Sequence, residues 1–192
     1  MPSNPKGYRP KTSRTQLPLT VGEQRKLFEG VKEKDRIRER ALLAFFLSTG
    51  AHPMVLANVK CGFTWSQDYY EWHRPKTHKV ITSSWSRAMR ESGILQYFDV
   101  NRKRGTLLEK DVSTYRKLLE RIGQRVGIKL NCLKCRHTSF VNEARLQHNA
   151  FDIAMKANTN LQTVYRYYMI GMGESKALSP DDKEFLQWLM EP

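Results

Sequence analysis

Three kinds of side chain along this sequence could together carry out a phosphoryl transfer without a metal ion. Lys76 lies between two strand-like stretches, Arg136 lies within a predicted helix, and a tyrosine cluster follows at Tyr165, Tyr167 and Tyr168. A tyrosine hydroxyl can attack phosphorus, cations can offset charge on the non-bridging oxygens, and a proton donor can serve the leaving oxygen. The types and order of these residues therefore indicate chemistry at a phosphate group.

The segment around Arg136 is predicted to be a helix that runs from Asn131 to about Gln147. Asn131 is a favourable N-cap, and apolar residues recur at helical spacing at Leu133, Phe140, Val141 and Ala144. Arg136 lies on the same face, where an unpaired guanidinium would be costly. For this helix alone two explanations stay open: an internal carboxylate pairs with Arg136, or Arg136 is offered to an anion such as a phosphate.

The composition favours a polyanionic partner. The 192 residues include 33 Lys and Arg against 19 Asp and Glu, which gives a formal net charge of +14 and a sequence pI of about 9.9. A pI in this range is the usual electrostatic footprint of a nucleic-acid-binding domain. A nucleic acid is therefore the expected partner, and no small-molecule substrate is expected.

Membrane and cysteine signals favour a cytoplasmic protein. No apolar run approaches the roughly 20 residues of a membrane span, and no apolar core of a signal peptide follows the basic N-terminus. Three cysteines, an odd number, argue against a disulfide framework and for a reducing compartment. Cys132 and Cys135 form a single CxxC pair, which is a weak zinc signal without a second pair. The sequence therefore predicts no metal and no cofactor.

The apolar pattern predicts a mainly α-helical fold with a small antiparallel β-sheet (α+β). Thr20 and Glu23 have capping-box spacing at the start of the first helix. A second helix is expected from about Asp35 to Ser48, and Gly50 ends it. Aromatic and β-branched residues between positions 63 and 82 indicate three antiparallel strands, with Lys76 at the tip of the second hairpin.

Two later segments complete the expected elements. Residues 100–105 are expected to form a basic loop that contains Arg102, Lys103 and Arg104. Asn160 is predicted to cap a helix that ends near Ile170, because Gly171 and Gly173 follow. The buried stripe of that helix is expected to consist of Leu161, Val164 and Tyr168, with the other two tyrosines of the cluster pointing elsewhere. A last helix is expected after Ser179.

Five segments stand in the order of motifs in a known family. They are residues 19–23 (LTVGE), 46–52 (FLSTGAH), 74–79 (RPKTHK), 135–138 (CRHT) and 158–167 (NTNLQTVYRY). From about residue 19 to residue 168 the chain resembles the catalytic domain of the tyrosine recombinases, which include phage-type integrases and Xer-like enzymes. The resemblance implies that catalytic-domain fold over residues 18–178, with a basic arm or interdomain linker at 1–17. It also implies that the C-terminal helix, at 179–192, either packs in cis or docks on a neighbouring protomer.

The resemblance implies roles for the retained residues Lys76, Arg136 and Tyr167, and for the residues that stand at two other motif positions, His52 and Asn158. Tyr167 would attack a DNA phosphate and form a 3′-phosphotyrosyl intermediate. Arg136 and His52 would hold the phosphate, Lys76 would protonate the leaving 5′ oxygen, and Asn158 would assist. The resemblance also implies double-stranded DNA as the partner, a homo-oligomer on that DNA and a location at the nucleoid. It is compatible with an origin in a virus, plasmid or other mobile element. Contacts to DNA are expected from Lys76, Arg136, His137, Lys134, Arg102, Lys103 and Arg104.

Four family positions carry other residues here. His52 stands where the family has Arg, Val55 where it has Glu, Leu133 where it has His or Lys, and Asn158 where it has His or Trp. Arginine binds phosphate through a fork of donors that histidine lacks, and Leu133 can neither accept nor donate a proton. These departures predict impaired or atypical catalysis. The alternative function is a catalytically inactive DNA-binding protein that keeps the fold. The alternative nucleophile, after Tyr167, is Tyr168.

Overall fold

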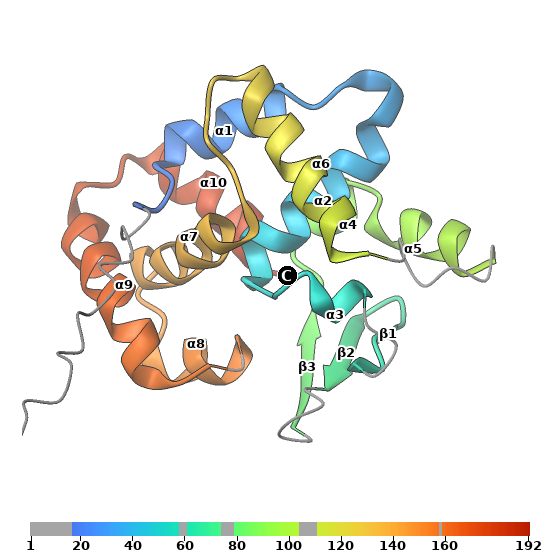
Figure 1. Cartoon of the computed structure of the whole chain (residues 1–192). Helices are drawn as coiled ribbons and strands as arrows, with labels where there is room; N and C mark the ends of the chain where they lie inside the picture. Colours follow the sequence, from blue (N-terminus) through green and yellow to red (C-terminus); the bar gives the residue numbers. More distant parts are fainter. Residues whose placement is uncertain (1–16, 58–60, 74–78, 104–110, 158) are drawn as a thin grey trace, which may run out of the picture.

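The computed structural model describes residues 17–57, 61–73, 79–103, 111–157 and 159–192 (Figure 1). It is mainly α-helical with one small antiparallel sheet, as the sequence predicts. Within these residues no helix is long and apolar enough to cross a bilayer. The helices are α1 (Val21–Glu29), α2 (Arg36–Thr49), α3 (Met54–Ala57), α4 (Arg87–Glu91), α5 (Ile94–Lys103), α6 (Val112–Arg125), α7 (Cys132–Arg145), α8 (Ala150–Lys156), α9 (Leu161–Glu174) and α10 (Pro180–Met190), with short 3-10 turns η1 (Glu33–Asp35) and η3 (Ser175–Ala177).

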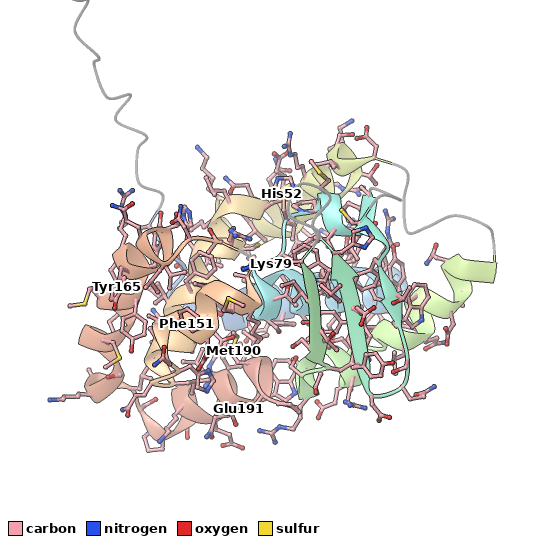
Figure 2. All side chains as sticks on the ribbon, turned by 90° about the horizontal axis from the view of Figure 1, so that it is seen from below. His52, Lys79, Phe151, Tyr165, Met190 and Glu191 are labelled. Atoms are coloured by element: carbon pink, nitrogen blue, oxygen red, sulfur yellow. The ribbon has the colours of Figure 1, made fainter. Side chains whose placement is uncertain are left out.

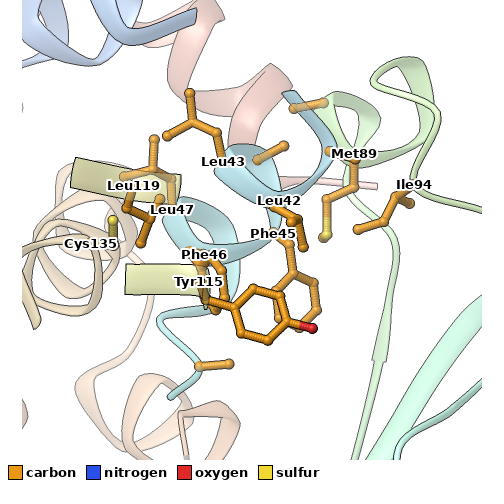
Figure 3. Close-up of a cluster of buried hydrophobic side chains, with 14 of the residues drawn as sticks. Leu42, Leu43, Phe45, Phe46, Leu47, Met89, Ile94, Tyr115, Leu119 and Cys135 are labelled. Atoms are coloured by element: carbon orange, nitrogen blue, oxygen red, sulfur yellow. The ribbon is translucent and has the colours of Figure 1, made fainter. Parts of the chain in front are cut away.

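Helix α2 is the centre of the core. Every residue from Ala41 to Thr49 is buried, and the helix contacts α4, α5, α6, α7 and α10. A helix that is buried on all sides is apolar on all sides, which explains the dense apolar run in its sequence. Figure 3 shows its leucine and phenylalanine side chains packed with Tyr115 and Leu119 of α6 and Met89 of α4.

The sheet lies at one edge of the helical body (Figure 1). Its strands, β1 (Thr64–Trp65), β2 (Tyr69–His73) and β3 (Val80–Ser84), are antiparallel in the order β1-β2-β3. Trp72 pairs with Ile81, and both side chains pack on the core together with Tyr70. Lys76, which the sequence places at the tip of the β2–β3 hairpin, lies outside the described residues.

The predicted helix starts and stops are largely confirmed. Thr20 and Glu23 form both halves of the capping box of α1. The Asn131 side chain accepts a hydrogen bond from the backbone N–H of Lys134 at 2.8 Å, which caps α7. Asn160 caps α9 in the same way, through the N–H of Thr163 at 2.7 Å. Gly50 ends α2 in the left-handed conformation, with φ of 58°.

The prediction of a basic loop at residues 100–105 is wrong for residues 100–103, which are helical. Helix α5 continues from Ile94 to Lys103, because Tyr97 and Phe98 pack on the core and hold the helix in place. Arg104 lies outside the described residues, and so do the side chains of Arg102 and Lys103.

The predicted end of α9 and its predicted buried face are also wrong. The helix runs through Gly171 and Gly173 to Glu174, and its buried residues are Val164, Tyr167 and Gly171. A Cβ atom on Gly171 would lie 2.5 Å from the carbonyl oxygen of Val141 and 2.6 Å from the Cβ of Ala144, both in α7. Gly171 therefore does not end the helix; it allows α9 to approach α7 closely, and this contact decides which tyrosine is buried.

In this single chain α10 packs in cis. Leu186 and Leu189 are fully buried, the Ser48 hydroxyl donates to the carbonyl oxygen of Leu189 at 2.6 Å, and the N–H of Arg87 donates to Glu191 O at 2.8 Å. The helix thus closes the core against α2 and α4.

The two glycines of α9 provide a matched test of this packing. Gly171→Ala is expected to destabilise the protein by about 1–3 kcal/mol, because its methyl group meets the α7 backbone. A methyl group added at Gly173 would have no atom within 4 Å. Gly173→Ala should therefore leave the stability of the protein unchanged or raise it by up to about 1 kcal/mol, because alanine has the higher helix propensity. Urea unfolding followed by circular dichroism measures both. Equal effects of the two substitutions would contradict the close approach at Gly171.

Candidate active site

Arg136 is held in position by two backbone carbonyl groups. Its guanidinium donates from Nη1 to the Gly50 oxygen at 2.7 Å and from Nη2 to the Ala157 oxygen at 3.0 Å. It also lies 5.2 Å from the centroid of the Phe140 ring. Carbonyl acceptors orient a guanidinium without cancelling its charge. The side chain therefore joins the end of α2 to the end of α8 while keeping a positive charge in a half-buried place.

A cleft of about 370 Å³ opens in front of Arg136. Its walls come from the segment after α2, from α6, and from the first turns of α7. The N-terminus of α7 contributes a partial positive charge, which adds to the charges of the arginines. The cleft is lined by Ala51, His52, Arg116, Glu120, Asn131, Cys132, Leu133 and Arg136.

His52 is neutral in this environment. Its Nδ1 accepts a hydrogen bond from the backbone N–H of Met54 at 3.1 Å, which leaves the proton on Nε2. Partial burial, followed by the charges of Arg136 and Arg116, lowers the pKa of His52 below its ordinary value. A bound phosphate would oppose these two cations and raise that pKa.

Leu133 lies in the cleft and not in the core. The sequence places it on the buried stripe of α7, but its side chain is 52% exposed. The start of α7 faces the core with Cys132 and Cys135 instead, and the fully buried Phe140, Val141 and Ala144 follow along the helix. Lys134, the neighbouring candidate for DNA contact, is half-buried and is not among the residues that line the cleft.

Tyr167 is buried, contrary to its predicted orientation. Its ring is 4% exposed and stacks on the imidazole of His137, with centroids 4.0 Å apart and an interplanar angle of 20°. Burial raises the pKa of Tyr167, and a hydrogen bond with Arg166 and the Arg166 charge oppose that shift. The tyrosine thus packs beside the α7 residue that follows Arg136, and it is not among the described residues that line the cleft.

The neighbouring tyrosines lie on other faces of α9. Tyr165 is 49% exposed, and Tyr168, which the sequence places on the buried stripe, is half-buried. Figure 2 shows Tyr165 at the outer side of the helical body. His137, expected to contact DNA, is mostly covered by Tyr167.

Lys79, just before β3, lies on the side of the molecule where Arg136 is anchored. Its Nζ lies 4.0 Å from the Met155 sulfur of α8, and Figure 2 shows Lys79 between the sheet and α8. The carbonyl of Ala157, which follows α8, anchors Arg136. Lys76 and Asn158 themselves lie outside the described residues.

Arg116 is the cleft residue that the motif pattern does not reveal. On α6 it follows the buried Tyr115, so the helical pattern places it only on the polar face. Which part of that face meets the start of α7 depends on how the two helices pack. No signal in the sequence of α6 distinguishes Arg116 from the basic residues around it.

A buried ion cluster fixes α8 against α7. Glu143 of α7 is buried, accepts a hydrogen bond from Lys156 Nζ at 2.6 Å, and pairs closely with His148 Nδ1. Burial would raise the pKa of Glu143, but the contacts with His148 and Lys156 outweigh it and lower that pKa. The hydrogen bond to Glu143 raises the pKa of His148. Because Lys156 precedes Ala157, this cluster also helps to place the carbonyl that holds Arg136.

The same architecture occurs in solved recombinase structures. The crystal structure of XerA recombinase matches 92% of this chain and 66% of its own, with a TM-score of 0.67 and 17% sequence identity. Structures of XerH site-specific recombinase bound to its difH substrate, before and after cleavage, match 83% of this chain and 52% of theirs. Their TM-scores are 0.60 and 0.61, at 20% and 19% identity. The chain therefore has the fold of a tyrosine-recombinase catalytic domain and spans about two thirds of XerA and half of XerH.

No protein-family model and no curated protein sequence matches the chain. At these identities the structural likeness establishes the fold.

The Glu143 cluster predicts a pH-dependent contribution to stability. The pKa of His148 is raised in the folded state, so its contribution is full below its unfolded value of about 6.5 and is lost as pH rises through the folded value. His148→Gln should therefore destabilise the protein more at about pH 6 than at about pH 9. Unfolding by urea at both values of pH measures the difference, and an equal loss at both would exclude the charged pair.

Proposed function

We propose that this protein binds duplex DNA at the Arg136 cleft and acts as a site-specific tyrosine recombinase with Tyr167 as its nucleophile. The observation that supports this function best is the placement of Arg136. Two neutral carbonyl acceptors hold its guanidinium at a cleft that also contains His52 and the N-terminus of α7. A fixed guanidinium beside a helix N-terminus is suited to bind a phosphate.

The charge of the chain supports DNA as the source of that phosphate. A net charge of +14 favours contacts with many phosphates along a duplex. XerH, which shares the fold, is a site-specific recombinase bound to its difH substrate in two structures. We further propose that the chain acts on DNA as a homo-oligomer, and that residues 1–17 follow the DNA backbone as a basic arm.

In the proposed reaction, the Tyr167 oxygen attacks phosphorus and forms a 3′-phosphotyrosyl bond as the bond to the 5′ oxygen breaks. Lys76 gives a proton to that leaving oxygen, Arg136 and His52 hold the non-bridging oxygens, and Asn158 assists. The 5′ hydroxyl of a DNA end then attacks the phosphotyrosine and releases Tyr167, which restores the phosphodiester.

Two features of the site make this chemistry slow. The Tyr167 ring must leave its stack on His137 to reach a phosphate in the cleft. Leu133 stands at the position where the family has a proton acceptor, so the residue there cannot take the Tyr167 proton. Burial also raises the pKa of the hydroxyl. These same features favour the second candidate function, a DNA-binding protein that keeps the recombinase fold without strand cleavage.

A nicked suicide substrate distinguishes the two functions. Such a duplex loses a short fragment after cleavage, so the covalent adduct accumulates and runs as a shifted band on a denaturing gel. We expect an adduct with the wild type and none with Tyr167→Phe, because only the phenol oxygen can bond to phosphorus.

Two further variants serve as controls. Tyr165→Phe and Tyr168→Phe should still form the adduct, since those hydroxyls have no role in the proposed step. Binding that weakens steeply with salt but yields no adduct in the wild type would support the DNA-binding candidate. An adduct that persists in Tyr167→Phe would assign the nucleophile to another residue.

Leu133 offers a gain-of-function test. Leu133→His places a group that can accept a proton in the cleft, at a half-exposed position where the substitution should not disturb the core. We expect adduct formation to accelerate by about 10²-fold, the lower end for general acid–base catalysis. Leu133→Asn, polar but unable to accept a proton near neutral pH, is the control. Equal rates in the two variants would exclude a missing base as the cause of slow cleavage.

A further inference from the structure

Arg116 reaches the cleft from α6, a different wall from the segment after α2 that carries His52. It is an exposed residue that lines the same cavity as Arg136 and His52. Within the described part of the chain its guanidinium makes no hydrogen bond and no ion pair. Glu120, one helical turn further on, lines the cleft too, yet the two side chains form no ion pair. Arg116 therefore has all its donors available to a ligand in the cleft.

The charge of Arg116 acts on two walls of the cleft. It lowers the pKa of His52, after the effects of burial and of Arg136. On the opposite wall, burial raises the pKa of Cys132 to about 11, and the Arg116 charge opposes that shift. Both residues line the cavity, so the guanidinium lies within electrostatic reach of the start of α7 and of the segment after α2.

We propose that Arg116 is a phosphate-binding residue of this cleft, and that it supplies from α6 the second guanidinium that His52 cannot supply from the segment after α2. The proposal rests on the proposed function, because the ligand that it names is a DNA phosphate.

The charges of the cleft fit a phosphodiester. Two guanidinium groups and the Glu120 carboxylate leave one net positive charge on its lining side chains when His52 is neutral. The Arg116 guanidinium can donate two parallel hydrogen bonds to phosphate oxygens, and the neutral His52 adds its Nε2–H. Glu120 limits the repulsion between Arg116 and Arg136 in the empty cleft, so both arginines can remain close together without a ligand.

The first test uses inorganic phosphate as the probe and the His52 imidazole as the reporter. Phosphate titrations followed by NMR of the His52 ring are compared for wild type, Arg116→Gln and Arg121→Gln. Arg121 is the matched control, because it lies on α6 but lines a neighbouring cavity with Lys117. We expect phosphate to raise the His52 pKa in the wild type, and Arg116→Gln to weaken phosphate binding about tenfold or more. Arg121→Gln should bind phosphate as the wild type does.

The second test is a rescue. If Arg116 takes over from the arginine that the family has at position 52, then His52→Arg in the Arg116→Gln background should restore duplex DNA affinity and the salt slope. Arg116→Gln alone should reduce that slope by about 1, and Arg121→Gln by less, because only Arg116 is proposed to contact the phosphate in the cleft.

The outcomes separate this inference from the proposed function. Equal effects of Arg116→Gln and Arg121→Gln on phosphate affinity, an unresponsive His52 in the wild type, or a double variant without rescue would overturn the role of Arg116. A selective loss with Arg116→Gln together with no covalent DNA adduct would leave Arg116 as a phosphate ligand and remove strand cleavage. An adduct whose formation does not depend on Arg116 would support strand cleavage and remove Arg116 as a phosphate ligand.

Discussion

The hydrogen bonds from Arg136 to the carbonyl oxygens of Gly50 and Ala157 are the constraint on which the site depends. They require Gly50 to end α2 in the left-handed conformation, and they require α8 to finish close to α7. Glu143 secures the second condition through Lys156, next to Ala157. Since both acceptors are neutral, the same bonds that join three helices also leave a fixed positive charge at the mouth of the cleft.

Phosphate binding and strand cleavage make different demands on this structure. Binding needs cations at the cleft, and Arg136 and Arg116 are both there. Cleavage also needs a free tyrosine and a proton acceptor, whereas Tyr167 is stacked on His137 and Leu133 has no polar group. The contact of α9 with α7 at Gly171 stabilises the fold in the arrangement that buries Tyr167. The proposed cleavage therefore requires Tyr167 to leave its stack on His137, and phosphate binding does not.

Local signals predicted most elements but not their contacts. Thr20, Asn131 and Asn160 mark helix starts because each satisfies backbone N–H groups only three residues away. Gly171 was misleading because the local sequence does not distinguish a glycine that ends a helix from a glycine that allows two helices to pack closely. The approach of α9 to α7 turned the helix so that Tyr167 is buried and Tyr168 is not.

The sequence by itself determined the fold class, the order of the motifs and the choice of Arg136 as the cation to examine. These depend on periodicity, capping and spacing, which are properties of neighbouring residues. Only the tertiary structure decided that Leu133 faces the cleft, that Tyr167 is buried, and that Arg116 lines the same cavity as His52. The physical reason is that these facts depend on how whole helices rotate and converge. Packing across the core sets that arrangement, and it leaves no mark within a single helix.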